Sequence, residues 1–301
     1  MISGPRVGDC GVMRTIVATR GTAATSGRPG TPRVGCLLVR IARFVTPAGT
    51  VAVGAVEAPA GAPVEAATVA VLTEYPMLGP VEFTGERWAL PDLRLLAPIR
   101  PGKVVCIGRN YAEHAREMGG EPPERPVLFM KPNTSVIGPF DPVRMPLESE
   151  RVDFEGELAV VIGGPATDVP RDRALEHVFG YTCANDVTAR DLQKIDAQWT
   201  RAKGYDTFCP LGPWIETVLD PADLAIRTEL DGELRQDSRT SLLLHDVPTL
   251  IAYISHVMTL LPGDVILTGT PAGVGPMRDG QSVSVTVDGI GTLTNPVTLR
   301  K

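Results

Sequence analysis

Three acidic residues alternate along a segment that ends in an apolar run. Asp153, Glu155 and Glu157 occupy every second position near the start of residues 152–162, and positions 158–162 are all apolar. If this segment is one strand, the three carboxylates point to the same face, about 6.5–7 Å apart. Like charges at this spacing repel one another unless a cation neutralises them. A solvated strand face is the alternative interpretation of the pattern.

A fourth acid, Asp186, follows a predicted buried strand at 178–184 and precedes a predicted helix at 187–194. Arg190 and Gln193 lie four and seven residues after Asp186, on the same helical face. We therefore predict that these two side chains bind an anionic ligand beside the carboxylate. Asp186 could instead only cap the helix by accepting backbone N–H groups.

A site made of Glu155, Glu157 and Asp186 would offer only oxygen ligands. Mg²⁺ and Mn²⁺ prefer such ligands and Ca²⁺ can also bind them, whereas Zn²⁺ more often recruits His or Cys. Three protein ligands leave about three of six octahedral positions for water and substrate. A 2-oxo acid could fill two of them, and the metal would then act as a Lewis acid that stabilises an enolate. Asp153 is then expected to hydrogen-bond a ligand or a water, and Gly156 to allow close backbone approach on the opposite face.

A short helix predicted at 111–118 places His114 and Glu117 three residues apart on one face. A carboxylate beside an imidazole fixes its tautomer and raises its basicity, as a general base requires. The helix lies in a segment rich in Gly and Pro, of the kind that forms a lid. A surface His–Glu pair is the alternative.

Three further polar residues follow predicted strands or lie in loops. Lys203, in a predicted polar loop, could hold a developing oxyanion, as could Gln193. Lys131 follows a predicted strand at 127–130 and could line a site. Thr270 lies in the loop GTPAGVG at 269–275, whose N–H groups and hydroxyls can bind a carboxylate.

The elements that must position these residues are mostly strands. Residues 1–37 are rich in Gly, Thr, Ala, Arg and Pro and are predicted to be a disordered extension. Residues 38–98 predict a small N-terminal β-rich domain, and residues 99–301 a catalytic domain. The fold class predicted is mainly β with peripheral helices.

Composition excludes several classes of protein. The formal net charge of −6 argues against a nucleic-acid or anionic-membrane partner. No apolar run approaches the roughly 18–20 residues of a membrane span. Five cysteines without CxxC spacing suggest a reduced, cytoplasmic setting.

Four segments together resemble the fumarylacetoacetate hydrolase family. They are GRNYAEH at 108–114, VDFEGEL at 152–158, NDVTARD at 185–191 and LTGTPAGVG at 267–275, in the family's order. The resemblance implies a mixed β-sandwich roll, usually a homodimer, with a Mg²⁺ or Mn²⁺ site. It assigns Glu155, Glu157 and Asp186 to the metal, His114 and Glu117 to a catalytic dyad, and Lys203, Gln193 and Thr270 to substrate contacts.

One position departs from the family pattern. Fumarylacetoacetate hydrolases proper carry an additional aspartate ligand seven residues before the histidine, where this chain has Ile107. The sequence is therefore more similar to the acylpyruvase and 2-hydroxyhepta-2,4-diene-1,7-dioate isomerase branch.

This branch implies a metal-dependent C–C hydrolase of acylpyruvate-type 2,4-dioxo acids, which the His114–Glu117 pair favours. The alternatives are isomerisation or decarboxylation of a dienedioate in aromatic catabolism, and decarboxylation of oxaloacetate. All of these reactions pass through an enolate, so the metal ligands do not choose between them. A non-catalytic β-protein that binds a metal or a ligand is the alternative from another class.

Overall fold

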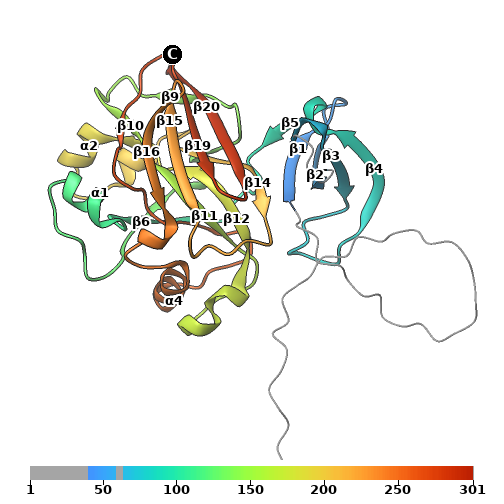
Figure 1. The fold of residues 1–301 in the computed structure, drawn as a ribbon, viewed down its shortest axis with the longest axis horizontal. Helices are drawn as coiled ribbons and strands as arrows, with labels where there is room; N and C mark the ends of the chain where they lie inside the picture. Colours follow the sequence, from blue (N-terminus) through green and yellow to red (C-terminus); the bar gives the residue numbers. More distant parts are fainter. Residues whose placement is uncertain (1–39, 59–63, 301) are drawn as a thin grey trace, which may run out of the picture.

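The computed structural model describes residues 40–58 and 64–300. Most of the regular secondary structure in this part of the chain belongs to two large β-sheets and one small sheet, and the helices lie at the periphery (Figure 1). The prediction of a mainly β fold with peripheral helices is therefore confirmed. The extension predicted at 1–37 lies outside the described residues.

The larger sheet has twelve strands within the described residues. Its path runs β4-β3-β2-β1-β14-β12-β11-β17-β6-β7, while β5 pairs with β1 and β8 with β14. Its strands are β1 (Arg40–Val45), β2 (Val51–Glu57), β3 (Thr68–Leu72), β4 (Phe83–Ala89), β5 (Arg94–Leu96), β6 (Val104–Gly108), β7 (Val127–Lys131), β8 (Val136–Ile137), β11 (Gly156–Ile162), β12 (Val178–Asn185), β14 (Cys209–Glu216) and β17 (Val265–Leu267).

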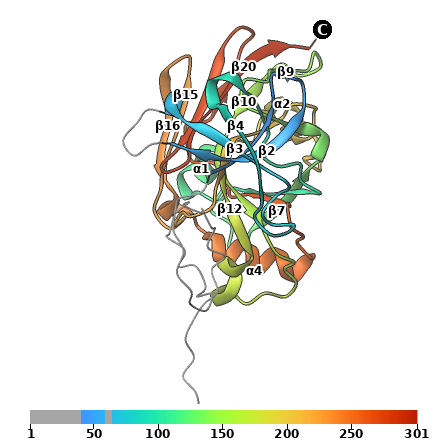
Figure 2. The same cartoon turned by 90° about the vertical axis from the view of Figure 1, so that its right-hand side faces the viewer.

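Strands β1 to β5 stand to one side of the molecule and face the viewer in Figure 2. They join the rest of the sheet where β1 pairs with β14, through Arg40 opposite Glu216 and Ile41 opposite Ile215. The β-rich character predicted for residues 38–98 is present in the described part of that range. The domain boundary near residue 98 stays a prediction.

The second large sheet covers the central part of the first. Its order is β16-β15-β19-β20-β9. Its strands are β9 (Val143–Met145), β15 (Ala225–Leu230), β16 (Glu233–Arg239), β19 (Ser282–Val287) and β20 (Gly291–Leu299). Strands β15, β19 and β20 contact β11, β12 and β14 of the larger sheet. A two-residue turn at Asp231-Gly232 joins β15 to β16.

Strand β11 is central and is buried on both faces. Leu158, Val160 and Ile162 pack into the core between the two large sheets. Ala159 and Val161 belong to a second buried cluster on the other face. An antiparallel strand with one face in solvent would alternate apolar and polar residues. Because neither face of β11 meets solvent, its apolar run is continuous.

The single strand predicted at 152–162 is in fact two strands. Strand β10 (Val152–Phe154) pairs with β13 (Thr188–Ala189) and β18 (Gly275–Pro276) in the small sheet, whereas β11 belongs to the large one. Between β10 and β11, side chains take the place of strand backbone as hydrogen-bond acceptors. Glu155 N–H donates to Asn185 Oδ1, and Gly156 N–H donates to Gln236 Oε1. The three acids therefore do not share one strand face.

The helices differ from their predicted bounds. They are α1 (Ala112–Glu117), α2 (Arg190–Ile195), α3 (Thr200–Lys203) and α4 (Val247–Val257), with short 3-10 segments at Val64–Ala66, Leu90–Asp92, Asn133–Ser135, Arg171–His177 and Thr240–Leu242. The helix predicted from residue 187 begins only at Arg190, because Thr188–Ala189 pairs with β10. Lys203 lies in α3 and not in a loop. Among these helices of residues 40–58 and 64–300, none is long and apolar enough to cross a membrane.

Candidate active site

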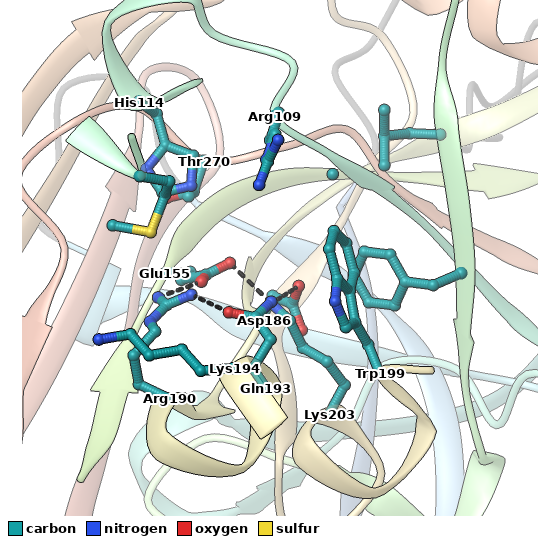
Figure 3. A pocket seen from close by; sticks show the side chains of 14 residues that line it. Arg109, His114, Glu155, Asp186, Arg190, Gln193, Lys194, Trp199, Lys203 and Thr270 are labelled. Carbon is teal, nitrogen blue, oxygen red and sulfur yellow. Dashed lines mark hydrogen bonds and ion pairs between the residues drawn. The ribbon is translucent and has the colours of Figure 1, made fainter. Parts of the chain in front are cut away.

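A cavity of about 280 Å³ lies between α1, α2, α3 and the ends of β6 and β7 (Figure 3). Most of the predicted site residues line it: His114, Glu155, Asp186, Arg190, Gln193, Lys203 and Thr270. They come from segments spread over 157 positions of the chain, from residue 114 to residue 270 inclusive. Ile107, which stands where the family pattern has an aspartate, also lines the cavity.

Glu155, Glu157 and Asp186 converge on one point. Each offers a carboxylate oxygen, and the three oxygens all lie within 4.8 Å of one another. All three residues are buried, at 4%, 1% and 1% exposure respectively. Glu155 stands at the junction of β10 and β11, Glu157 lies in β11, and Asp186 follows β12. The pairing of β11 with β12 brings them together, since Gly156 lies opposite Asn185.

The three carboxylates are electrostatically unequal. Burial, together with repulsion from Asp186 and Glu155, raises the pKa of Glu157 well above its usual range. Burial also disfavours the charged form of Glu155, but the attraction of Lys203 and Arg190 outweighs it and lowers the pKa of Glu155. Glu157 accepts a hydrogen bond from Gly269 N–H and has no cationic side chain within ion-pair distance among the described residues.

Two buried lysines contact the carboxylates. Lys203 Nζ lies 2.9 Å from Glu155 Oε2 and 2.6 Å from Asp186 Oδ2. Lys131 Nζ lies 2.7 Å from Asp186 Oδ1 and also donates to the carbonyls of Val187, Lys203 and Phe208. Lys131 does not line the cavity, so its ammonium group contacts Asp186 from outside the cavity. Its predicted contact with substrate stays a prediction without geometric support.

Arg190 links Asp153 of β10 to Glu155 in the site. Its Nε donates to Asp153 Oδ2 at 2.9 Å, its Nη2 binds Glu155 Oε1, and its Nη1 donates to Gln193 Oε1 at 2.6 Å. Asp153 is also paired with Arg151, so it is fully buried between two guanidinium groups. Asp153 thus acts on Glu155 through Arg190 and does not reach the cavity itself.

His114 and Glu117 form a pair at the cavity wall. His114 Nδ1 lies 3.1 Å from Glu117 Oε2, and Glu117 Oε1 accepts the backbone N–H of Gly273 at 3.0 Å. The loop after β17 therefore holds the carboxylate that orients the imidazole. An ionised Glu117 favours a proton on Nδ1, which leaves Nε2 as the nitrogen available to a ligand.

Thr270 is held by Gln236, a residue that the sequence patterns did not predict for the site. Its hydroxyl donates to Gly156 O and accepts from Gln236 Nε2, both within 2.9 Å. Gln236 is buried in β16, and its Oε1 accepts from Gly156 N–H. Gln236 thus connects the loop of Thr270 to the junction at Glu155. A single glutamine in a strand carries no sequence signal for this role.

Gly156 allows the close approach predicted for it. A Cβ built on Gly156 would lie 2.0 Å from Thr228 Oγ1 and 3.2 Å from Val285 Cγ1. We expect Gly156→Ala to lower the free energy of unfolding by about 1–3 kcal/mol, because the added carbon must displace β15 and Gln236. Urea denaturation of the metal-free protein measures this. Gly164→Ala is the control, because a Cβ there has no neighbour nearer than 3.9 Å, and equal stability of the two variants would contradict the prediction.

The donor set fits a hard divalent cation. All three groups are carboxylates that converge on one point, as Mg²⁺, Mn²⁺ and Ca²⁺ require. The raised pKa of Glu157 shows that three charges are unfavourable there without a further positive charge. A cation at this point would remove that cost. The carboxylate triad can therefore hold a divalent ion.

Comparison with family models identifies the class of protein. The model described as "Fumarylacetoacetate (FAA) hydrolase C-terminal" matches residues 103–298, and one described as "Rv2993c-like, N-terminal" matches residues 39–98. The chain belongs to the fumarylacetoacetate hydrolase family.

Two relatives of known sequence illustrate the range of the family. The chain is 56% identical over 262 residues to "Protein Rv2993c" of Mycobacterium tuberculosis, covering 86% of this chain and 98% of the relative. It is 44% identical over 225 residues to "Oxaloacetate tautomerase YisK" of Bacillus subtilis, covering 70% of this chain and 75% of the relative.

Two solved structures share the fold. A 5-carboxymethyl-2-hydroxymuconate delta-isomerase from Mycobacterium smegmatis is 55% identical with a TM-score of 0.80, covering 87% of this chain and all of the other. A fumarylpyruvate hydrolase from Pseudomonas aeruginosa, solved with Mn²⁺ and pyruvate, is 37% identical with a TM-score of 0.65 and covers 67% of this chain and 91% of the other. The named activities of these relatives span isomerisation, tautomerisation and hydrolysis.

Proposed function

We propose that the protein is a divalent-metal-dependent hydrolase that cleaves the C3–C4 bond of 2,4-dioxo acids of the acylpyruvate type. One observation carries the proposal. His114, paired with Glu117, lines the same cavity as Glu155 and Asp186, so a water-activating base would lie beside a site for a 2-oxo acid. Hydrolysis needs such a base to make a nucleophile from water.

Glu155, Glu157 and Asp186 would hold Mg²⁺ or Mn²⁺. The bound ion would supply Lewis-acid polarisation of the 2-oxo group. Thr270 and Gln193, which line the cavity, would orient the 2-oxo acid. The ammonium group of Lys203 lies between Glu155 and Asp186, where it would stabilise negative charge that develops on the substrate.

The chemical step follows from the position of His114. Its Nε2 takes a proton from water as the hydroxide adds to C4. The C3–C4 bond then breaks, and its electron pair stays with C3 as the enolate of pyruvate. A proton returned to C3 gives pyruvate, and the acyl group leaves as a carboxylic acid. Water is consumed, and one carbon–carbon bond is exchanged for a carbon–oxygen bond.

A second candidate function is keto–enol tautomerisation of oxaloacetate. The relative named oxaloacetate tautomerase favours it, at 44% identity. The same base could move a proton between C3 and the enol oxygen without attack by water. Isomerisation or decarboxylation of a dienedioate uses the same enolate, and the relative named as an isomerase favours that reaction.

A panel of substrates with the wild-type protein tests the proposal. We expect 2,4-dioxopentanoate to yield pyruvate in the presence of Mn²⁺, measured by coupling to lactate dehydrogenase, and EDTA to stop the reaction. Turnover of oxaloacetate enol or of a dienedioate with inert 2,4-dioxo acids would favour the second candidate. If no 2-oxo acid is turned over with any divalent ion, a non-catalytic binding protein becomes the better description.

We also propose that the protein acts in the cytoplasm as a homodimer, without a nucleic-acid or membrane partner. The net charge of −6 and the family's usual assembly support this. Light scattering of the purified protein measures the oligomeric state directly.

A further inference from the structure

Arg109 lines the cavity but takes no part in the network described above. It follows β6 directly and is half-buried. Figure 3 shows its guanidinium group entering from the side opposite the helices that carry Arg190, Gln193 and Lys203. The 2-oxo acid site and Arg109 therefore face each other across the cavity.

The charge of Arg109 is not compensated by any acidic side chain of residues 40–58 and 64–300. The other two buried cations of the cavity are each paired: Arg190 with Asp153 and Glu155, and Lys203 with Glu155 and Asp186. No hydrogen bond or ion pair joins Arg109 to the part of the chain that the structure describes. Its planar fork of N–H donors is thus available, and this fork matches a carboxylate in a bidentate way.

The backbone holds Arg109 in an unfavourable conformation. Its φ is +58°, in the left-handed region that residues with a side chain rarely adopt. The neighbouring Asn110 is fully buried and fixes this turn, because its side chain binds Thr268 O and both backbone groups of His245. Strained residues that neighbours hold in place are typical of ligand-binding sites.

A glycine leaves room for the guanidinium group. A Cβ built on Gly120, in the turn after α1, would lie 2.8 Å from Arg109 Nη1. The guanidinium is therefore placed between the turn that follows His114 and the open cavity. Its position does not depend on any charged partner within the described residues.

We propose that Arg109 binds a second carboxylate, at the end of the substrate remote from its 2-oxo acid group. This inference rests on the proposed function, because it takes the 2-oxo acid end to be held at Glu155 and Asp186. The substrate class is then a dicarboxylic 2,4-dioxo acid, in which the acyl group to be released ends in a carboxylate. The products are pyruvate and a dicarboxylic acid.

A matched pair of substrates tests the role of Arg109. The compounds 2,4-dioxoheptanedioate and 2,4-dioxoheptanoate differ only in a carboxylate or a methyl group at C7. We expect wild type to prefer the dicarboxylate in kcat/KM, and Arg109→Met to lower the ratio of the two kcat/KM values by about 10- to 100-fold. Arg109→Lys keeps a charge without the fork and is expected to lower the ratio less.

Lys194→Met is the control, because Lys194 is an exposed cation that lines the same cavity. We expect it to change the ratio less than about threefold. An equal loss in Lys194→Met would overturn the proposal, since the preference would then reflect general positive charge. An unchanged ratio in Arg109→Met would also overturn it, as would an equal fall in both kcat/KM values.

Equilibrium binding separates this proposal from the proposed function. 2-Oxoheptanedioate and 2-oxoheptanoate lack the 4-oxo group and cannot be cleaved hydrolytically. Calorimetry with Mn²⁺ is expected to show tighter binding of the dicarboxylate to wild type, and loss of this preference in Arg109→Met. If neither dioxo acid is cleaved but this pattern holds, the hydrolase function fails and the Arg109 assignment stands. Equal affinity of wild type for both ligands would overturn the Arg109 assignment.

Discussion

Replacing Glu157 by glutamine is expected to abolish Mn²⁺-dependent cleavage of 2,4-dioxopentanoate without destabilising the metal-free protein. Residues that only support a metal ligand typically change affinity by about 10–100-fold, so removal of a ligand should cost at least about 100-fold. The fold should tolerate the change, because burial and the neighbouring carboxylates raise the pKa of Glu157, so its charge costs free energy in the metal-free protein. Glutamine removes that charge and keeps an oxygen that can accept from Gly269 N–H.

Thermal unfolding with and without Mn²⁺ measures both effects. A ligand at about 100 times its Kd stabilises the folded state by about 2.7 kcal/mol, and Glu157→Gln should lose this gain. Its unfolding temperature without metal should equal or exceed that of wild type. Glu229→Gln, an exposed position on β15, is the control and should keep the gain. Full stabilisation of Glu157→Gln by Mn²⁺ would show that the ion binds elsewhere.

Glu157 is a better position for this test than Asp186. Lys131 and Lys203 both contact Asp186, so Asp186→Asn would leave two buried ammonium groups with less compensation. Breaking a buried ion pair from one side commonly costs about 3–5 kcal/mol. A loss of activity in Asp186→Asn could therefore reflect unfolding. Glu157 has no such cationic partner among the described residues.

The second large effect is expected from His114→Ala. Removal of a general base typically lowers the rate by about 10²–10⁴-fold, so kcat for 2,4-dioxopentanoate should fall by that factor. Stabilisation by Mn²⁺ should persist, because His114 does not belong to the carboxylate triad. Glu117→Gln should cause a smaller loss, since it orients the imidazole from Nδ1 without touching the substrate.

Stopped-flow absorbance of the dioxo acid measures these rates. Equal rates for wild type and His114→Ala would eliminate the proposed mechanism while leaving the metal site intact. If cleavage stops in His114→Ala but oxaloacetate tautomerisation continues, water activation and proton transfer at C3 use different groups. The two variants, Glu157→Gln and His114→Ala, thus separate metal binding from base catalysis.

Much of the site was predictable because its residues belong to short local patterns. The acids of 153–157 and the His–Glu spacing of 114–117 are visible as alternation and helical periodicity. The resemblance of four segments to a known family joined these patterns into one site. The structure places seven of the ten predicted site residues along one cavity, which local patterns alone do not require. The other three, Glu117, Lys131 and Glu157, do not line it.

Other features depend on contacts between distant segments. The break at Glu155 arises because Asn185 and Gln236 bind the backbone of residues 155 and 156, and neither contact has a periodic signal. Asp153 is therefore directed to Arg190 and not to the carboxylate triad. Lys131, which is predicted to line the site, instead contacts Asp186 from outside the cavity. The sequence does not reveal this, because a lysine at a strand end gives no indication of which side of the sheet its ammonium group will occupy.

Three features of this protein could be predicted from its sequence: a mainly β fold, a carboxylate triad suited to a hard cation, and a His–Glu pair. These depend on residue type and on spacing within single elements. Which cations are compensated depends on the tertiary structure, because burial and ion pairing arise where segments far apart in the chain meet. The fold pairs Lys203 with Glu155 and Asp186, and Arg190 with Asp153 and Glu155. Among the described residues, Arg109 has no acidic side chain to neutralise it.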